Sequence, residues 1–369
     1  MSTTSRPELT QLLLDLLALP CVTGEEGPIA DWLIARYHDE PVLRVGQSVV
    51  VGHSRGDRPT VLLVGHLDVV PPTAHDRLPR RDGQRIVGRG ASDMKAGLAV
   101  AMSCFDDPRL RAGPYALLLV AYAGEEGPHE ANELGAVLAA DPRLRAAALA
   151  IVLEPTDLTV QLGCLGALHA RVTFSGRSAH SARPWEGENA LTKAGRFLAE
   201  LHELPPRDVI VDGLVYREVL SATRASTGGN ARNVVPDRFT INLNFRFAPN
   251  RTLEQAEDRV VELVGGAAAV EVVDRAPPCP PSRDAPLVAR FLDVVGAPVE
   301  AKQAWTDVAR LSAAGIPALN YGPGLTAQAH QAGEYVPEGN LVVARSAIGR
   351  FLADGGKVRQ KRHREVPHE

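Results

Sequence analysis

Apolar residues along the chain recur with two different spacings, and these spacings predict its secondary structure. The leucines between Leu9 and Leu17 recur at helical intervals, whereas Val61 to Val64 form an unbroken apolar run typical of a buried strand. Met94–Phe105 has the pattern of a helix, and Tyr115–Ala123 and Ala146–Leu153 are further apolar runs of strand length. Strands that alternate with helices predict an α/β fold with a mostly parallel central sheet.

From about Gly166 the pattern changes to that of half-exposed strands. Between Phe239 and Phe247 apolar and polar residues alternate with a period of two. The predicted order is β-α-β-β-α-β, which is that of a ferredoxin-like unit. Its strands are expected at 167–174, 219–227, 239–247 and 270–273, and its helices at 189–204 and 253–263. The sequence therefore predicts an inserted α+β domain at residues 167–278, which ends at a proline-rich hinge, within a first domain formed by residues 1–166 and 279–369.

Composition excludes several classes of protein. The chain has 369 residues, of which 45% are hydrophobic and 23% charged, so it is globular and long enough for two domains. A formal net charge of -4 and a pI near 6.3 argue against nucleic acid as a partner. Basic residues gather only in the tail, at about 356–369, which we expect to be disordered and solvated.

The cysteines and the apolar segments predict a compartment. Cys21, Cys104, Cys164 and Cys279 are far apart in the sequence and have no metal-knuckle or dithiol spacing, so we expect them to be reduced and mostly buried. The sequence has no signal-peptide pattern and no apolar run long enough to cross a bilayer. We therefore expect a cytoplasmic protein that does not bind membranes.

His66 and Asp68 form the first candidate for chemistry. They follow the apolar run at 61–64, and residues i and i+2 of an extended segment point the same way. One ring nitrogen of His66 could bind a metal while Asp68 holds the proton on the other. A His-x-Asp pair is often just solvated, so the pair needs support from other residues.

Further candidate ligands follow other predicted strands. Glu125 and Glu126 come directly after one run, Glu154 after another, and Asp93 precedes a predicted helix, where it could equally be a helix cap. His330 lies in a glycine-rich loop, where a lone histidine usually has no role. Together, two imidazoles (His66, His330) and three carboxylates (Asp93, Glu126, Glu154) suit two zinc-like ions, with Glu125 free as a base.

Six motifs resemble one enzyme family. GHLDVVPP, GRGASDMKAG, AGEEG, LEPT, GRSAHSARPWEGENA and AHQAGEYVP occur in this order and resemble the aminoacylase and carboxypeptidase family of co-catalytic zinc hydrolases. The resemblance covers nearly the whole chain except the basic tail. It implies a zinc-hydrolase catalytic domain with an inserted dimerisation or lid domain. Within the family, WTDVARLSAAGIPALNYGPG and NFRFAPNRTLEQA resemble the succinyl-diaminopimelate desuccinylases most.

The resemblance also implies a role for individual residues. It makes Asp93 the ligand that bridges two divalent ions, most simply zinc, with cobalt as an alternative. His66 and Glu154 would bind one ion, and Glu126 and His330 the other. Asp68 would orient His66, and Glu125 would be the general acid and base. The remaining implied residues are His180, which stabilises the oxyanion in the site of the neighbouring subunit of a homodimer, and Asn233 and Arg246, which bind substrate carboxylates.

The implied reaction is hydrolysis of a small anionic N-acyl amino acid. A water held between two metals, deprotonated by Glu125, would attack the amide and remove the succinyl group from N-succinyl-LL-2,6-diaminopimelate, a step of lysine biosynthesis. The chain has Gly163, Cys164, Leu165 and Gly166 where desuccinylases carry basic residues. This departure leaves acetylornithine deacetylase and other N-acyl-amino-acid deacylases open, with a dipeptidase or carboxypeptidase less favoured. A non-catalytic binding module would lack a ligand or the base, and neither is missing.

Overall fold

The centre of the molecule is an eight-stranded sheet. A computed structural model describes residues 5–54, 56–74, 76 and 78–355. The sheet order is β1-β2-β6-β3-β7-β17-β8-β16, and the four neighbours β6, β3, β7 and β17 run parallel, whereas β2–β6 and β17–β8 pair antiparallel. The prediction of a mostly parallel sheet is confirmed, with antiparallel pairs toward both edges. The strands are β1 (Val42–Val45), β2 (Ser48–Gly52), β3 (Thr60–His66), β6 (Ala116–Tyr122), β7 (Leu149–Val152), β8 (Val160–Leu162), β16 (Val299–Ala301) and β17 (Ala318–Asn320).

Helices bury both faces of this sheet. Val61 and Leu63 of β3 pack into one hydrophobic core and Leu62 and Val64 into another, which explains why the strand has no polar residue between 61 and 64. On the first face lie α1 (Arg6–Leu17), α2 (Gly27–Arg36), α3 (Ala96–Asp106), α4 (Pro108–Arg111), α10 (Pro286–Val295) and α12 (Glu338–Ala353); on the second lie α5 (Leu134–Ala140), α6 (Pro142–Arg145) and α11 (Val308–Ala313).

The second unit is an antiparallel sheet with helices on one face. Its order is β11-β12-β14-β9-β15, and without β11 this is the strand order of the predicted ferredoxin-like unit. Inward-facing residues of β14 alternate with partly exposed ones, as the period of two predicted. The predicted helix at 189–204 is divided at Ala194, next to Gly195, because glycine weakens a helix interior. The elements are β9 (Gly166–Ser175), α7 (Ala190–Lys193), α8 (Gly195–Glu203), β11 (Arg207–Val211), β12 (Leu214–Thr227), β14 (Arg238–Phe247), α9 (Leu253–Val264) and β15 (Ala269–Ala276).

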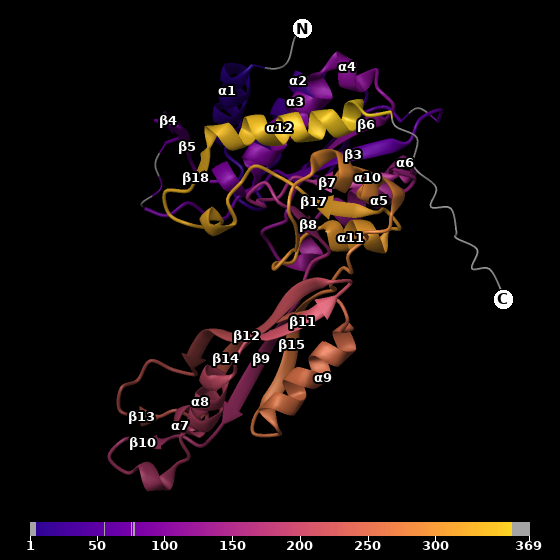
Figure 1. Cartoon of the computed structure of the whole chain (residues 1–369). Helices are drawn as coiled ribbons and strands as arrows, with labels where there is room; N and C mark the ends of the chain where they lie inside the picture. The colour runs from indigo at the N-terminus through magenta and orange to yellow at the C-terminus, as the bar shows by residue number, and fades with distance from the viewer. Residues whose placement is uncertain (1–4, 55, 75, 77, 356–369) are drawn as a thin grey trace, which may run out of the picture.

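The chain passes between the two units at one place. Figure 1 shows the second unit as a separate lobe below the large sheet. Cys164 and Cys279, on the outgoing and returning segments, pair with each other through two backbone hydrogen bonds of 2.9 and 3.1 Å. All four cysteines are buried and free, as expected, but these two are neighbours in space, which their separation in the sequence conceals.

Two small sheets complete the description. β4 (Arg80–Asp82), β5 (Arg85–Val87) and β18 (Tyr335–Pro337) lie beside the large sheet, and β10 (Ala179–His180) pairs with β13 (Val234–Val235) at the far end of the second lobe (Figure 1). Within the described part of the chain, every helix is too short or too polar to cross a bilayer. The predicted disordered tail lies outside the described residues.

Candidate active site

Three strands of the large sheet end at the same place and bring the predicted ligands together. His66 is the last residue of β3, Glu125 and Glu126 follow β6, and Glu154 follows β7. Because β3 pairs in parallel with both β6 and β7, these ends lie side by side at the carboxyl edge of the sheet. One atom from each of His66, Asp93 and Glu126 lies within 4.8 Å of the others, so the group could hold a metal ion.

Asp93 lies between the two histidines. Its Oδ1 is 3.2 Å from Nε2 of His66, and its Oδ2 is 3.8 Å from Nε2 of His330. Nε2 of His330 is also 2.8 Å from Oε2 of Glu126. The two oxygens of one carboxylate therefore face different imidazoles, which is the arrangement of a bridging ligand.

Asp68 holds both His66 and the glutamates that follow β6. Its backbone carbonyl is 3.0 Å from Nδ1 of His66, and its carboxylate oxygen is 3.5 Å from the same atom. The carboxylate also accepts hydrogen bonds from the backbone N–H groups of Glu125 (3.1 Å) and Glu126 (2.9 Å) and from the Thr23 hydroxyl (3.0 Å). Asp68 thus fixes two ligand-bearing segments, whereas the sequence predicted only its contact with His66.

A buried glutamate that sequence reasoning missed holds Asp93. Glu334 is 1% exposed, and its carboxylate accepts backbone hydrogen bonds from Gly90 (2.8 Å), Ser92 (2.7 Å) and Asp93 (2.9 Å). Arg89 donates a further bond to it at 3.2 Å. Glu334 follows His330 by four residues, so it connects the two loops that carry Asp93 and His330. The motif AHQAGEYVP contained it, but nothing in its sequence context distinguished it from a surface glutamate.

The carboxylates and His66 change one another's pKa values. Burial lowers the pKa of His66, but hydrogen bonds to Asp68 and Asp93 outweigh it and raise that pKa well above its ordinary value. Burial and the neighbouring Asp93 raise the pKa of Glu154 to about 7. Burial and the charge of Glu154 also raise the pKa of Glu125 well above its usual range. The cluster therefore holds more negative charge than it can stabilise without a cation.

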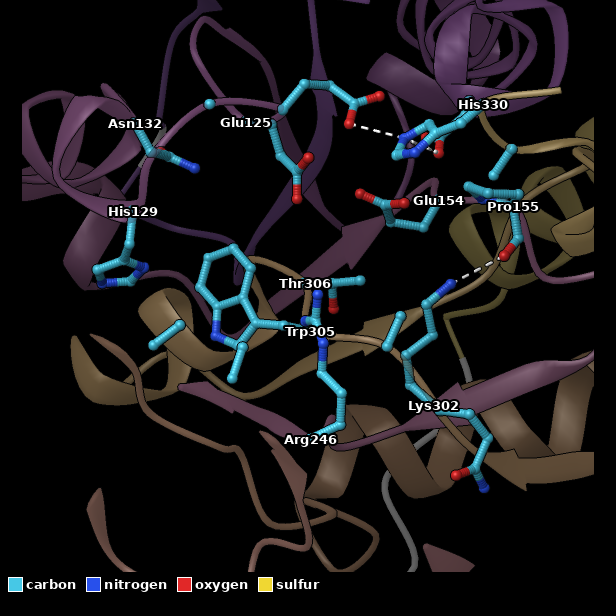
Figure 2. A pocket seen from close by; sticks show the side chains of 18 of the residues that line it. Glu125, His129, Asn132, Glu154, Pro155, Arg246, Lys302, Trp305, Thr306 and His330 are labelled. Carbon is cyan, nitrogen blue, oxygen red and sulfur yellow. Dashed lines mark hydrogen bonds and ion pairs between the residues drawn. The ribbon is translucent and has the colours of Figure 1, made fainter. Parts of the chain in front are cut away.

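One cavity joins this cluster to the second lobe. Its volume is about 530 Å³, which is within the range of small-molecule sites. Figure 2 shows Glu125, Glu154 and His330 at one end, with Arg246 and Trp305 opposite them. Arg246 lies on β14 and lines this cavity, and its contact with a substrate carboxylate stays a prediction. Lining residues that the sequence did not indicate include His129, Asn132, His169, Lys302, Gln303, Trp305 and Thr306.

His180 and Asn233 lie far from this cavity in the same chain. The backbone N–H of Ser181 donates a hydrogen bond to the carbonyl of Asn233 at 2.9 Å. This bond, together with the pairing of β10 and β13, keeps His180 and Asn233 close to each other. Both side chains are exposed at the far end of the second lobe (Figure 1), and neither lines the cavity. A single chain therefore brings eight of the ten predicted site residues together and leaves two apart.

Imidazoles and carboxylates that converge at strand ends, beside a carboxyl group of raised pKa in a cavity of this size, define a hydrolytic enzyme. Known families make the class more specific. The model of peptidase family M20/M25/M40 matches residues 62–354, and the chain belongs to this family.

Curated relatives extend over nearly the whole chain. A Mycobacterium tuberculosis protein named as a candidate succinyl-diaminopimelate desuccinylase is 38% identical over 351 residues, which cover 94% of this chain and 97% of the relative. The succinyl-diaminopimelate desuccinylase of Corynebacterium glutamicum is 37% identical and covers 94% of this chain and 95% of its own length. The acetylornithine deacetylase of Myxococcus xanthus is more distant, with 30% identity over 94% of this chain and 97% of the relative.

Solved structures share the fold. A tripeptidase from Staphylococcus aureus superposes with a TM-score of 0.75 over 95% of this chain and 99% of its own, at 19% identity. A Bacillus subtilis protein described as a dinuclear metal-binding peptidase of family M20 has a TM-score of 0.63 over 94% of this chain and 97% of its own, at 17% identity. At these identities the likeness concerns the fold.

Proposed function

We propose that this enzyme removes the succinyl group from N-succinyl-LL-2,6-diaminopimelate, in the cytoplasm, as a step of diaminopimelate and lysine biosynthesis. The observation that carries the proposal is the strand-end cluster with Glu125, joined by one cavity to the cationic side chain of Arg246. Relatives with this activity in their names align over almost the full chain and support the choice of substrate.

Two divalent metal ions fit the residues of the cluster. Glu154 is 4% exposed, and among the described residues its Oε1 has no hydrogen-bond partner. A buried carboxylate oxygen without a partner is costly, and a cation would relieve that cost. The donor set of two imidazoles and three carboxylates is that of zinc or cobalt sites. We assign Asp93 as the bridging ligand, His66 and Glu154 to one ion, and Glu126 and His330 to the other.

Glu125 is assigned as the general acid and base. When bound, the metal ions lower the pKa of a water molecule and polarise the amide carbonyl. Glu125 takes the proton of the attacking water and passes it to the leaving amine. Burial and the charge of Glu154 raise the pKa of Glu125, which favours a carboxyl group that can hold the proton before it passes to the leaving amine.

Arg246 is assigned to a carboxylate of the substrate. Burial lowers the pKa of its guanidinium, and no described residue forms a hydrogen bond or ion pair with it. A guanidinium without a partner in a cavity can bind a carboxylate with two parallel hydrogen bonds. Asn233 is assigned to a second substrate carboxylate, and from its place on the second lobe it can do so only in a neighbouring subunit.

The exposed position of His180 supports a homodimer. The backbone N–H of Ala182 donates to Nδ1 of His180 at 3.1 Å, so the neutral ring carries its proton on Nε2, which is free to donate to an oxyanion. One edge of β12 pairs with β14, and the opposite edge pairs with β11 only at residues 214–218. Among the described residues, the opposite edge of residues 219–227 therefore has no neighbouring strand. Such an edge can pair with a second copy and bring His180 to the other cavity.

Activity on two substrates tests the proposal. Enzyme purified without chelators is analysed for metal and then assayed on N-succinyl-diaminopimelate and N-acetylornithine. We expect about two divalent ions per chain and a preference for the succinyl substrate. A preference for acetylornithine would instead support the deacetylase, which the buried, uncharged segment at 163–166 leaves open as the second candidate.

A further inference from the structure

Lys302 is a buried ammonium group that has almost no protein partners. It follows β16 directly and is only 5% exposed, yet it lines the cavity of the active site. Its Nζ donates one hydrogen bond, at 2.9 Å, to the backbone carbonyl of Pro155. No carboxylate of the described residues lies within ion-pairing distance. An ammonium has three donors, so two remain for a ligand.

The cost of burying this charge indicates an anionic ligand. A buried cation is expensive unless it is paired, and a carbonyl provides only part of the compensation. Lys302 is close enough to lower the pKa values of Asp93 and Glu154. Neutralising these two carboxylates does not, however, explain why a lysine is buried at this position. Once two divalent ions are bound, their four positive charges balance the three ligand carboxylates and Glu125, so the cluster has no unmatched carboxylate left for Lys302.

The position of Lys302 distinguishes it from Arg246. Figure 2 shows Lys302 reaching toward Pro155 and Glu154, whereas Arg246 enters the cavity beside Trp305. Arg246 comes from the second lobe and is partly exposed, whereas Lys302 comes from the large sheet and is almost completely buried. The more enclosed place suits the smaller half of the substrate, which is the acyl group, and the longer amine chain can extend toward the open side.

No cation is available from the segment at 163–166. Cys164 and Leu165 are buried and apolar, and Cys164 is held in its backbone pairing with Cys279. A carboxylate on the acyl group therefore needs a positive charge from elsewhere in the cavity wall, and Lys302 is placed to supply it.

We propose that Lys302 binds the terminal carboxylate of the acyl group and so selects short dicarboxylic acyl chains over acetyl. The inference rests on the proposed amide hydrolysis and names the residue that recognises the acyl group. Lys302 is a specificity-determining residue, and the reaction itself does not require it.

Two acyl forms of one amine test this role. Wild-type holoenzyme is first assayed on N-succinyl- and N-acetyl-diaminopimelate, which differ only in the acyl carboxylate. In Lys302→Met we expect kcat/KM to fall about a hundredfold for the succinyl form, because a desolvated charge pair is lost. The acetyl form should change by no more than a few-fold. Lys302→Arg should keep most of the preference, and Lys302→Gln is measured as a second neutral variant in case the Met variant fails to fold.

Lys95 provides a matched control. It is also buried, and its Nζ donates to one backbone carbonyl, that of Leu67, but it does not line the cavity. Lys95→Met should leave the ratio of succinyl to acetyl activity unchanged even if the overall rate falls. This separates the loss of any buried charge from the loss of a contact with the acyl group.

Binding of succinate gives a readout that does not depend on turnover. Succinate should inhibit or bind the wild-type holoenzyme much more strongly than Lys302→Met, while the metal content of the two proteins stays equal. The proposal is overturned if Lys302→Met loses the same factor of kcat/KM on the succinyl and the acetyl substrate. It is also overturned if the wild type and Lys302→Met bind succinate equally. If the wild type shows no preference for the succinyl form, the proposed substrate is wrong, and the succinate measurement still decides the role of Lys302.

Discussion

The two ends of the molecule carry predicted site residues in opposite settings. At the carboxyl edge of the large sheet, His66, Asp68 and Asp93 are buried or nearly so, and each has several partners. At the far end of the second lobe, His180 and Asn233 are exposed and held mainly by backbone pairing. The first group is preorganised within one chain, whereas the second lacks such contacts and, in the proposed homodimer, would act in the cavity of the other subunit.

This difference teaches how a site can be divided between chains. Side chains that must hold a charge cluster are fixed by burial and by hydrogen bonds, because a misplaced carboxylate there is costly. A residue that acts in another subunit must instead stay accessible until that subunit arrives. Exposure of His180 is therefore a requirement of the proposed role and is no argument against it.

The largest expected effect comes from the buried end. Glu125→Gln should lower kcat by about a thousandfold or more, because the amide cannot move the proton between water and leaving amine. Metal content, measured on the purified protein, should stay at the wild-type level, since Glu125 is not assigned as a ligand. Near-normal turnover in this variant would remove Glu125 from the mechanism.

The exposed end should show a large effect that can be restored in trans. His180→Ala should lower kcat by about a hundredfold or more, as removal of one oxyanion donor does. Mixing it with Glu125→Gln should restore about a quarter of wild-type activity, because about half of the dimers are mixed and each mixed dimer holds one intact site. If His180 acts within its own chain, the mixture stays inactive.

A smaller effect is expected from Glu334, which holds the backbone around the predicted ligand Asp93. Glu334→Gln should weaken metal binding or activity by about ten- to a hundredfold, because the amide cannot accept from the three backbone N–H groups around Asp93 as two carboxylate oxygens do. Metal titration of the apoenzyme is the measurement.

Glu338→Gln is the matched control for Glu334. Glu338 is also buried and on the C-terminal segment, but it bonds Arg6, Thr10 and Arg81. This change should lower thermal stability without changing metal affinity. Equal losses of metal affinity in both variants would mean that Glu334 acts through general stability and has no specific hold on Asp93.

The most gradual effect is a dependence of metal affinity on pH. In the metal-free protein the pKa of Glu154 is raised to about 7 and that of His66 well above 6.5, so both hold protons at acidic pH. Metal must displace these protons, and affinity should therefore fall by up to about tenfold per pH unit and per proton as pH drops below 7. Calorimetry in buffers of different ionisation enthalpy measures the proton release. Binding without proton release would contradict the assignment of these two residues as ligands.

The sequence predicted the α/β fold with an inserted α+β unit, and it predicted the ligand cluster, because both leave strong local patterns. Buried strands such as 61–64 appear as unbroken apolar runs, and ligand-type residues follow them directly. Lys302 and Glu334 left no such pattern, because their roles depend on contacts across more than a hundred residues, to Pro155 and Gly90 respectively. The short strands β8 and β16, which lie next to each other at one side of the large sheet, were missed because three residues are too few to show a period.

The backbone pairing of Cys164 with Cys279 has a consequence for the evolution of the protein. The segments that leave and re-enter the large sheet are neighbours, so the gap that a removed second lobe would leave could be closed by a short turn. A lobe attached in this way could be acquired or exchanged in one genetic event, with repacking needed where Val209, Leu214 and Tyr216 join the hydrophobic core of the large sheet. Closely similar catalytic layers could then serve different substrates by carrying different lobes.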